Sequence, residues 1–110
     1  MYDAAELIIV CSNTSTSEGR YGKRGRDFYS IVAGAFASIL MLLTSVSQGI
    51  ICACFVGTFE DDKVSEILNL PKHVKPIGII TLGYPAERTR KHERNGLTKL
   101  VYYERYGNSK

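Results

Sequence analysis

A long stretch without charge constrains the fold of this chain more than any other feature. The 32 residues from Phe28 to Phe59 include no Asp, Glu, Lys or Arg. About 20 apolar residues are enough to cross a bilayer, and several basic residues precede the stretch, as in a cytoplasmic flank. Polar side chains recur within it, however, and its most apolar part is only Ile39–Leu43. A buried helix followed by a buried strand is therefore favoured, and a small membrane protein is the weaker alternative.

Apolar runs and turn residues divide the chain into short elements. They predict strands at Ala4–Ser12, Ile50–Val56 and Ile77–Leu82, a long helix over Phe28–Gln48 ended by Gly49, and a short helix that begins at Asp61 and is stopped by Pro71. The segments between them are polar or basic, and we expect exposed loops or connectors at Asn13–Asp27, Lys72–Pro76 and Ala86–Gly96.

This order of elements narrows the fold class. Two strand–helix–strand units with buried strands favour an α/β or α+β fold with a mixed sheet. The chain has 110 residues, the size of one small domain. Because the long helix is apolar nearly all round, so short a chain has few residues with which to cover it. We therefore expect part of its surface to be buried between subunits.

The composition is that of a globular protein, with 45% hydrophobic and 23% charged residues, which excludes a fully disordered chain. The formal net charge of +3 permits anionic ligands, and no strand carries the aromatic pattern of an RNA-binding domain, so no nucleic acid is expected. Three cysteines are too few for a disulfide scaffold, and Cys52 and Cys54 are spaced too closely for a usual zinc site. Without a signal peptide at the N-terminus, reduced thiols and a cytoplasmic location are expected.

General catalytic motifs are absent from the sequence. It contains no Walker loop, no G-x-G-x-x-G after a strand, and neither G-x-S-x-G nor H-E-x-x-H. His73 and His92 lie in polar segments, where surface positions are expected rather than general bases. Two basic segments remain as candidates for phosphate binding, Gly19–Gly25 before the long helix and Arg88–Arg94 just past a strand. A solvated loop is the alternative interpretation of each.

Five segments, in order along the chain, together resemble the C-terminal half of a nitroreductase-family flavoprotein. They are Arg20–Gly25 (RYGKRG), Cys54–Phe59 (CFVGTF), Lys63–Pro71 (KVSEILNLP), Ile79–Glu87 (IITLGYPAE) and Leu97–Arg105 (LTKLVYYER). The last of them is similar to the closing strand of the family. No single motif is diagnostic, so the resemblance rests on the ordered series.

The resemblance implies a layered α+β fold and a homodimer whose core contains the long helix Phe28–Gln48. FMN would bind at the dimer interface and pass hydride from NADH or NADPH to nitroaromatics, quinones or similar acceptors. Because the cofactor supplies the chemistry, no side chain is assigned as catalytic and no metal is expected. The residues that match the family's flavin contacts are Phe55, Val56, Gly57 and Thr58 for the ring, and Lys91, His92 and Arg94 for the phosphate.

The sequence also departs from the family pattern. The N-terminal half of the family domain is missing, so residues 1–110 are expected to form one partial domain. That half carries much of the FMN phosphate site, and a second polypeptide is one way to supply it. Phe55 stands where Trp is common in the family. The alternative function is therefore a non-catalytic dimerising scaffold, or a truncated remnant that no longer binds FMN.

Overall fold

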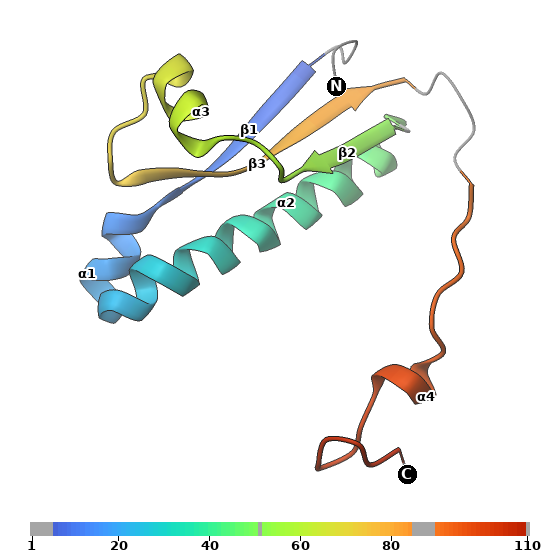
Figure 1. Cartoon of the computed structure of the whole chain (residues 1–110). Coiled ribbons are helices and arrows are strands. Elements are labelled where there is room, and N and C mark those ends of the chain that lie inside the picture. The colour runs from blue at the N-terminus through green and yellow to red at the C-terminus, as the bar shows by residue number, and fades with distance from the viewer. Residues whose placement is uncertain (1–5, 51, 85–89, 110) are drawn as a thin grey trace.

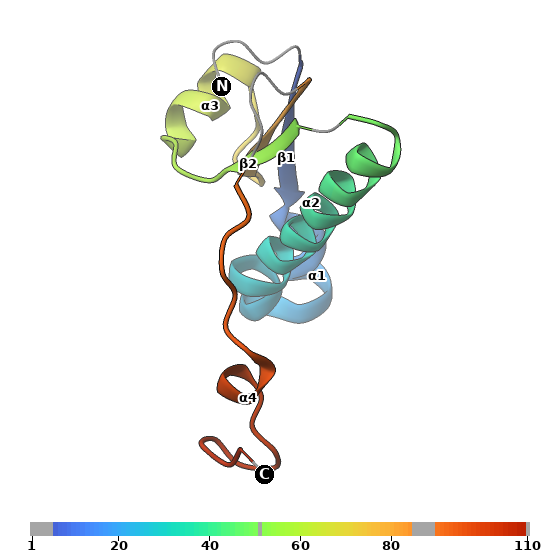
Figure 2. The same cartoon turned by 90° about the vertical axis from the view of Figure 1, so that its right-hand side faces the viewer.

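The computed structural model describes residues 6–50, 52–84 and 90–109. Its elements are β1 (Glu6–Asn13), α1 (Thr14–Arg24), the π-helical turn η1 (Gly25–Tyr29), α2 (Ser30–Ser47), β2 (Cys52–Val56), α3 (Asp61–Leu68), β3 (Val74–Gly83) and α4 (Leu97–Leu100). Helix α2 runs along one face of the sheet and α3 lies on the other (Figures 1 and 2). This layered arrangement confirms the α+β fold. The segment from residue 90 onward, with α4, leads away from the layers (Figure 1).

The sheet has the order β1-β3-β2, and both outer strands run antiparallel to β3. The predicted mixed sheet is therefore wrong for the described strands. The helical crossover between β1 and β2 does join two strands of the same direction, as a strand–helix–strand unit requires. The two are not neighbours, however, because β3 returns between them. Each adjacent pair of strands is consequently antiparallel.

The core of the described chain is small and centres on β3. Ile80 is fully buried, and in the register of the sheet it lies between Ile8 of β1 and Phe55 of β2. Val10 and Ile79 are the other buried apolar side chains among the described residues. Directly opposed residues of antiparallel strands share a face, so Ile8, Ile80 and Phe55 lie on one side of the sheet.

Helix α2 packs on the sheet through small residues. Ser30, Gly34, Ser38 and Ser45 are its buried positions. A Cβ atom added at Gly34 would lie 2.8 Å from the Ser12 hydroxyl oxygen, which means that helix and strand approach closely there. The buried hydroxyls remain hydrogen-bonded, because Ser38 Oγ donates to the carbonyl of Gly34 at 2.7 Å. Small side chains thus let the helix backbone approach the strands without leaving polar groups unpaired.

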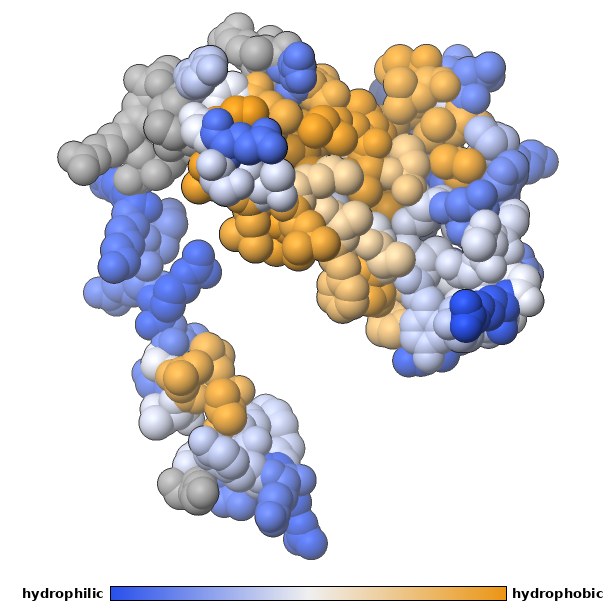
Figure 3. Space-filling model, turned by 180° about the vertical axis from the view of Figure 1, so that it is seen from behind, coloured by the Kyte–Doolittle hydropathy of each residue, from blue (hydrophilic) through white to orange (hydrophobic). Residues whose placement is uncertain are grey.

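The larger apolar side chains of α2 point away from the sheet. The exposed fractions of Phe36, Leu40 and Leu43 are 66%, 64% and 61%. Seen from behind, the body of the molecule presents a continuous hydrophobic surface (Figure 3). We call the apolar residues of α2 that point away from the sheet the outer face of the helix. They comprise Ile31, Phe36, Ile39, Leu40, Leu43 and Val46. Met41, 39% exposed, lies instead against β1.

The charge-free stretch divides into helix and strand, as expected, but neither is buried throughout in the single chain. Only four residues of α2 are buried, and Cys54 and Phe55 of β2 are exposed. Gly49 follows α2 with a φ of 86°, a left-handed conformation that suits glycine and ends the helix. Strand β2 then begins at Cys52. By length and composition alone, the helical segment Thr14–Ser47 could cross a membrane, and 22% of its most apolar window is buried in the fold. The segment is not one straight helix, because the chain turns at Gly22.

Element boundaries differ from those expected at several places. Residues 1–5 and 51, at the starts of two predicted strands, lie outside the described residues. Helix α3 ends at Asn69, which is left-handed with a φ of 55°, two residues before Pro71. Strand β3 begins at Val74, so the predicted connector Lys72–Pro76 is partly strand. Pro76 is tolerated because it pairs at the irregularity between Val10 and Cys11, where the regular ladder is interrupted.

The predicted loop Asn13–Asp27 is the clearest error, since α1 and η1 occupy most of it. The Asn13 side chain accepts a hydrogen bond from the Thr16 amide at 3.3 Å and caps α1. Gly22 then reverses the chain, with a φ of 68° inside the helix. The segment therefore folds as two helical pieces joined by a glycine turn.

The predicted basic loop Ala86–Gly96 is irregular wherever it is described, from residue 90 to 96, and residues 85–89 lie outside the described residues. The closing strand implied for Leu97–Arg105 is not present in the single chain. Leu97–Leu100 forms one helical turn instead. A strand needs a neighbour to satisfy its backbone groups, and in Figures 1 and 2 the tail lies apart from the sheet.

Candidate functional site

The turn after β2 presents peptide backbone at the surface. Phe55 and Val56 end the strand, and Gly57 and Thr58 lead to α3, which begins at Asp61. Gly57 and Thr58 are both exposed. Because Gly57 has no side chain, a planar ligand can approach the main chain closely at this point. We call Phe55–Thr58 the β2 turn.

The ring of Phe55 packs directly against the backbone of Gly78 in β3. A Cβ atom at Gly78 of β3 would collide with the Phe55 ring, so the ring occupies the space that a larger residue would fill. Phe55 nevertheless keeps 41% of its surface exposed. Sequence reasoning missed Gly78, although an isolated glycine inside an apolar strand is a known signal of close approach. The glycine fixes the ring beside the β2 turn.

The basic residues assigned to phosphate lie elsewhere in the single chain. Lys91, His92 and Arg94 belong to the exposed segment between residue 90 and α4. That segment runs away from the sheet in both views (Figures 1 and 2). Within the described part of the chain, no hydrogen bond or ion pair joins it to the β2 turn. One protomer alone therefore does not bring the two predicted groups together.

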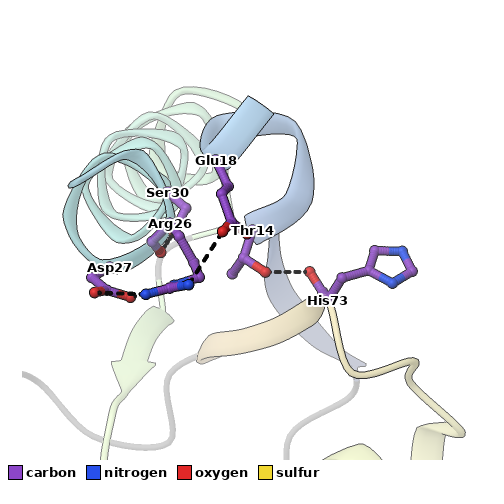
Figure 4. A network of polar contacts seen from close by, with 6 residues as sticks. All are labelled: Thr14, Glu18, Arg26, Asp27, Ser30 and His73. Carbon is purple, nitrogen blue, oxygen red and sulfur yellow. Dashed lines mark hydrogen bonds and ion pairs between the residues drawn. The ribbon is translucent and has the colours of Figure 1, made fainter. Parts of the chain in front are cut away.

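A polar network fixes the start of α2 (Figure 4). The Arg26 guanidinium pairs with Asp27 at 2.9 Å and with Glu18 of α1 at 3.2 Å. Its hydrogen bond holds the pKa of Asp27 below the ordinary carboxyl value, and the same bond raises the pKa of Arg26. Thr14 Oγ1 donates to the His73 carbonyl at 2.9 Å, which ties α1 to the segment before β3. These contacts explain how a segment of mostly polar residues is held in place.

A groove follows the free edge of β1. Its volume is about 470 Å³, and its lining includes Cys11, Ser12, Ala33, Gly34 and Met41. Burial raises the pKa of the Cys11 thiol. The groove offers a largely apolar surface for packing or binding.

Comparison with protein-family models identifies the fold. The model of the nitroreductase family matches residues 1–84. The chain belongs to the nitroreductase family. The match includes the whole β2 turn and Gly78, and it stops before Lys91. The site residues assigned on β2 therefore lie in the part of the chain that the family model covers.

Individual relatives point in the same direction. The FMN reductase (NADPH) of Bacillus subtilis (strain 168) is 35% identical over 78 residues, which are 68% of this chain and 30% of that protein. A nitroreductase family protein from Clostridium difficile 630 superposes with a TM-score of 0.80 at 26% identity, over 94% of this chain and 62% of that one. NfrA1 of B. megaterium gives a TM-score of 0.78 at 25% identity, over 94% and 47% of the two chains. This chain thus spans less than two thirds of each relative's length.

Proposed function

We propose that this chain takes part in a flavin-dependent oxidoreductase, in which FMN carries hydride from NADH or NADPH to nitroaromatic, quinone or similar acceptors. The observation that carries the proposal is the exposed glycine backbone of the β2 turn within a nitroreductase fold. The B. subtilis relative, named as an FMN reductase that uses NADPH, supports the same cofactor pair. FMN would supply the redox chemistry when bound, and the protein would place it.

The residues of the β2 turn and of the basic segment fit FMN. The backbone of Gly57 and Thr58 would lie against the flavin ring, with Phe55 held beside it by Gly78. Arg94 would neutralise the phosphate, with Lys91 or His92 next to it, since guanidinium groups bind phosphate strongly. All three side chains are exposed and form no ion pair among the described residues, so they are available to an anion.

A second copy of the chain would complete the site. The outer face of α2 leaves several large apolar side chains in water, more than a stable monomer usually exposes on one surface. The tail carries a further apolar group, with Leu97 76% and Leu100 59% exposed (Figure 3). We propose a homodimer in which the outer faces meet along the C-terminal half of α2, through the apolar side chains from Ile39 to Val46, and each tail crosses to its partner. The basic segment of one subunit would then reach the β2 turn of the other.

Visible absorbance with added FMN tests the proposal. The purified chain should retain FMN through gel filtration and show a perturbed flavin spectrum. Arg94→Ala should weaken FMN binding by roughly tenfold, the size of a lost charged hydrogen bond. Lys99→Ala, which removes the same charge from α4, is the matched control and should bind FMN as the unmodified chain does. A chain that binds no FMN at saturating concentration would overturn the proposal.

A non-catalytic scaffold is the second candidate. It is favoured by one observation, the separation of the basic segment from the β2 turn in the single chain. A stable dimer that leaves FMN free in solution would establish the scaffold. A dimer that retains FMN would exclude it.

A further inference from the structure

An aromatic and basic surface lies on α1 and η1, outside the β2 turn and the basic segment. It is formed by Arg20, Tyr21, Arg24, Phe28 and Tyr29, and we call it the aromatic–basic surface. Its rings are open to solvent, with Tyr21 54%, Phe28 48% and Tyr29 41% exposed. Exposed aromatic rings next to uncommitted cations are a combination that binds planar anionic ligands.

The cations are stacked on the rings. The central carbon of the Arg24 guanidinium lies 4.6 Å from the ring centre of Phe28 and 5.5 Å from that of Tyr29. The Arg20 guanidinium lies 5.4 Å from the ring centre of Tyr21. Contact with a ring face restrains a guanidinium group, yet its N–H donors lie in its plane and stay free for a phosphate. Stacking therefore prepares both arginines for an anion.

The rings also hold one another in place. Tyr21 and Tyr29 meet edge to face, with ring centres 5.2 Å apart. The reversal at Gly22 makes this contact possible, because it brings the two halves of the segment together. Arg20 and Tyr21 precede the reversal, whereas Arg24, Phe28 and Tyr29 follow it. The surface is therefore a product of the fold and not of neighbouring residues alone.

Its positive charge is not neutralised locally. The two acidic residues of the segment, Glu18 and Asp27, both pair with Arg26 (Figure 4). In the described part of the chain, no carboxylate forms an ion pair with Arg20, Lys23 or Arg24. The two arginines beside the exposed rings are thus available to an external anion. Lys23 differs from them, because its charge contributes to the lowered pKa of Asp27.

A hollow adjoins the rings. Its volume is about 520 Å³, and it is open to solvent. Its lining combines aromatic and aliphatic side chains with the hydroxyl groups of one serine and two tyrosines, from Ser17, Tyr21, Tyr29, Val32, Ala33 and Phe36. A flat heterocycle can stack there while a phosphate on it reaches the arginines. Hollow and cations together fit a phosphorylated nucleoside.

We infer that the aromatic–basic surface binds the adenosine 2′-phosphate part of NADPH. The inference rests on the proposed function, in which a nicotinamide nucleotide is the electron donor. It deepens that function by selecting NADPH over NADH, since only NADPH carries the additional phosphate. A nucleic acid fits less well, because the surface has only two cations without an ion-pair partner and the net charge of the chain is only +3.

Calorimetric titration of the flavin-free chain with adenosine fragments tests the inference without any redox readout. Adenosine 2′,5′-bisphosphate should bind at least about tenfold more tightly than adenosine 5′-monophosphate, the effect of one charged hydrogen-bonding pair. The double variant Arg20→Ala/Arg24→Ala should remove this preference. The control Lys63→Ala/Lys72→Ala loses the same charge from exposed positions on other segments and should keep it.

Further measurements distinguish a failure of this inference from a failure of the proposed function. Arg24→Lys keeps the charge but loses the planar group, and it should retain only part of the preference. Equal affinity for the two fragments, or no binding of either, would overturn the inference even if FMN binds. A chain that prefers the bisphosphate but never binds FMN would overturn the proposed function and leave the nucleotide site standing. Tight binding of a single-stranded oligonucleotide with no preference for the bisphosphate would assign the surface to nucleic acid and overturn the inference.

Discussion

The two sides of α2 use opposite kinds of residue. The buried positions on the sheet side are Ser and Gly, whereas the outer face carries Phe, Leu, Ile and Val. Hydrophobicity alone would instead place the large apolar residues on the sheet and the small residues in solvent. The close approach of helix and strand explains the small residue at Gly34, where there is no room for a larger side chain. The large apolar residues of the outer face stay exposed in the single chain, and it is there that we propose a second copy packs.

Adding volume to the inner side should have the largest effect. Gly34→Leu would force helix and strand apart, because even a Cβ atom would lie within 3 Å of two side chains, those of Ser12 and Ile77. We expect a loss of about 3 kcal/mol in the free energy of unfolding, the upper end for overpacking. Urea unfolding followed by circular dichroism measures it.

The neighbouring substitution Ala35→Leu adds the same side chain at an exposed position of α2. It should change stability by less than about 0.5 kcal/mol, as surface changes usually do. Equal losses for both variants would show that the inner side is not tightly packed.

Charging the outer face should separate subunits without unfolding them. Leu40→Asp would place a carboxylate in the proposed dimer contact and weaken dimerisation by about 2 kcal/mol, roughly thirtyfold in dissociation constant. Analytical ultracentrifugation over a range of concentrations measures this constant. Ile67→Asp is the control, since Ile67 is an equally apolar residue, 81% exposed, on α3. An unmodified chain that stays monomeric at every concentration would contradict the contact.

Removing polarity from the inner side should matter less than adding volume. Ser38→Ala deletes a buried hydroxyl that bonds within its own helix, so the small size is kept and the strand contacts are unchanged. We expect a change of about 1 kcal/mol or less, because alanine regains helix propensity. Ser47→Ala removes the same kind of bond, 2.7 Å to the carbonyl of Thr44, at an exposed position. A loss for Ser38→Ala as large as that for Gly34→Leu would mean that polarity, and not size, governs this side.

The smallest effect should come from pH, because neither side of α2 carries a titratable group. The ion pair at its start does titrate. Since the pKa of Asp27 is lowered in the folded chain, its contribution to stability is present above the ordinary carboxyl pKa and is lost as the pH falls through the folded value. Asp27→Asn should therefore lower the melting temperature slightly at pH 7 and not at about pH 2, well below the ordinary carboxyl pKa. A difference that persists unchanged at the lower pH would assign the effect to packing.

Sequence patterns within a few residues were enough to predict those helices and strands that are determined by neighbouring residues. The positions of three strands, the long helix, its end at Gly49 and the start of α3 at Asp61 follow from apolar runs and from residues that cap or break helices. The predicted burial of the second strand was wrong for the single chain, because Cys54 and Phe55 of β2 are exposed. Helix α1 was missed because its support is not local. A Cβ atom at Gly25 would collide with the Ser17 carbonyl, and this packing of η1 against α1 is visible only once the chain has turned at Gly22.

The candidate site likewise has a part that is local in sequence, which was predicted, and a part that is not, which was missed. Phe55–Thr58 are consecutive, so a sequence match was enough to place them at one turn. Gly78, which supports the Phe55 ring, is more than 20 residues away along the chain and was not identified. The relation of Arg94 to that turn depends on where the tail goes, and we propose that a second chain determines this. Sheet order also lay beyond local patterns, which is why the mixed sheet was predicted wrongly.

The central place of β3 has a consequence for biosynthesis. Within the described sheet, β1 and β2 each pair only with β3, which follows both of them along the chain. No pair of these strands can form until β3 has emerged from the ribosome. Until then α2 has no sheet to cover its inner side, so its apolar residues are exposed in the nascent chain. Slower translation of the segment between α2 and β3 would prolong that exposure and favour aggregation.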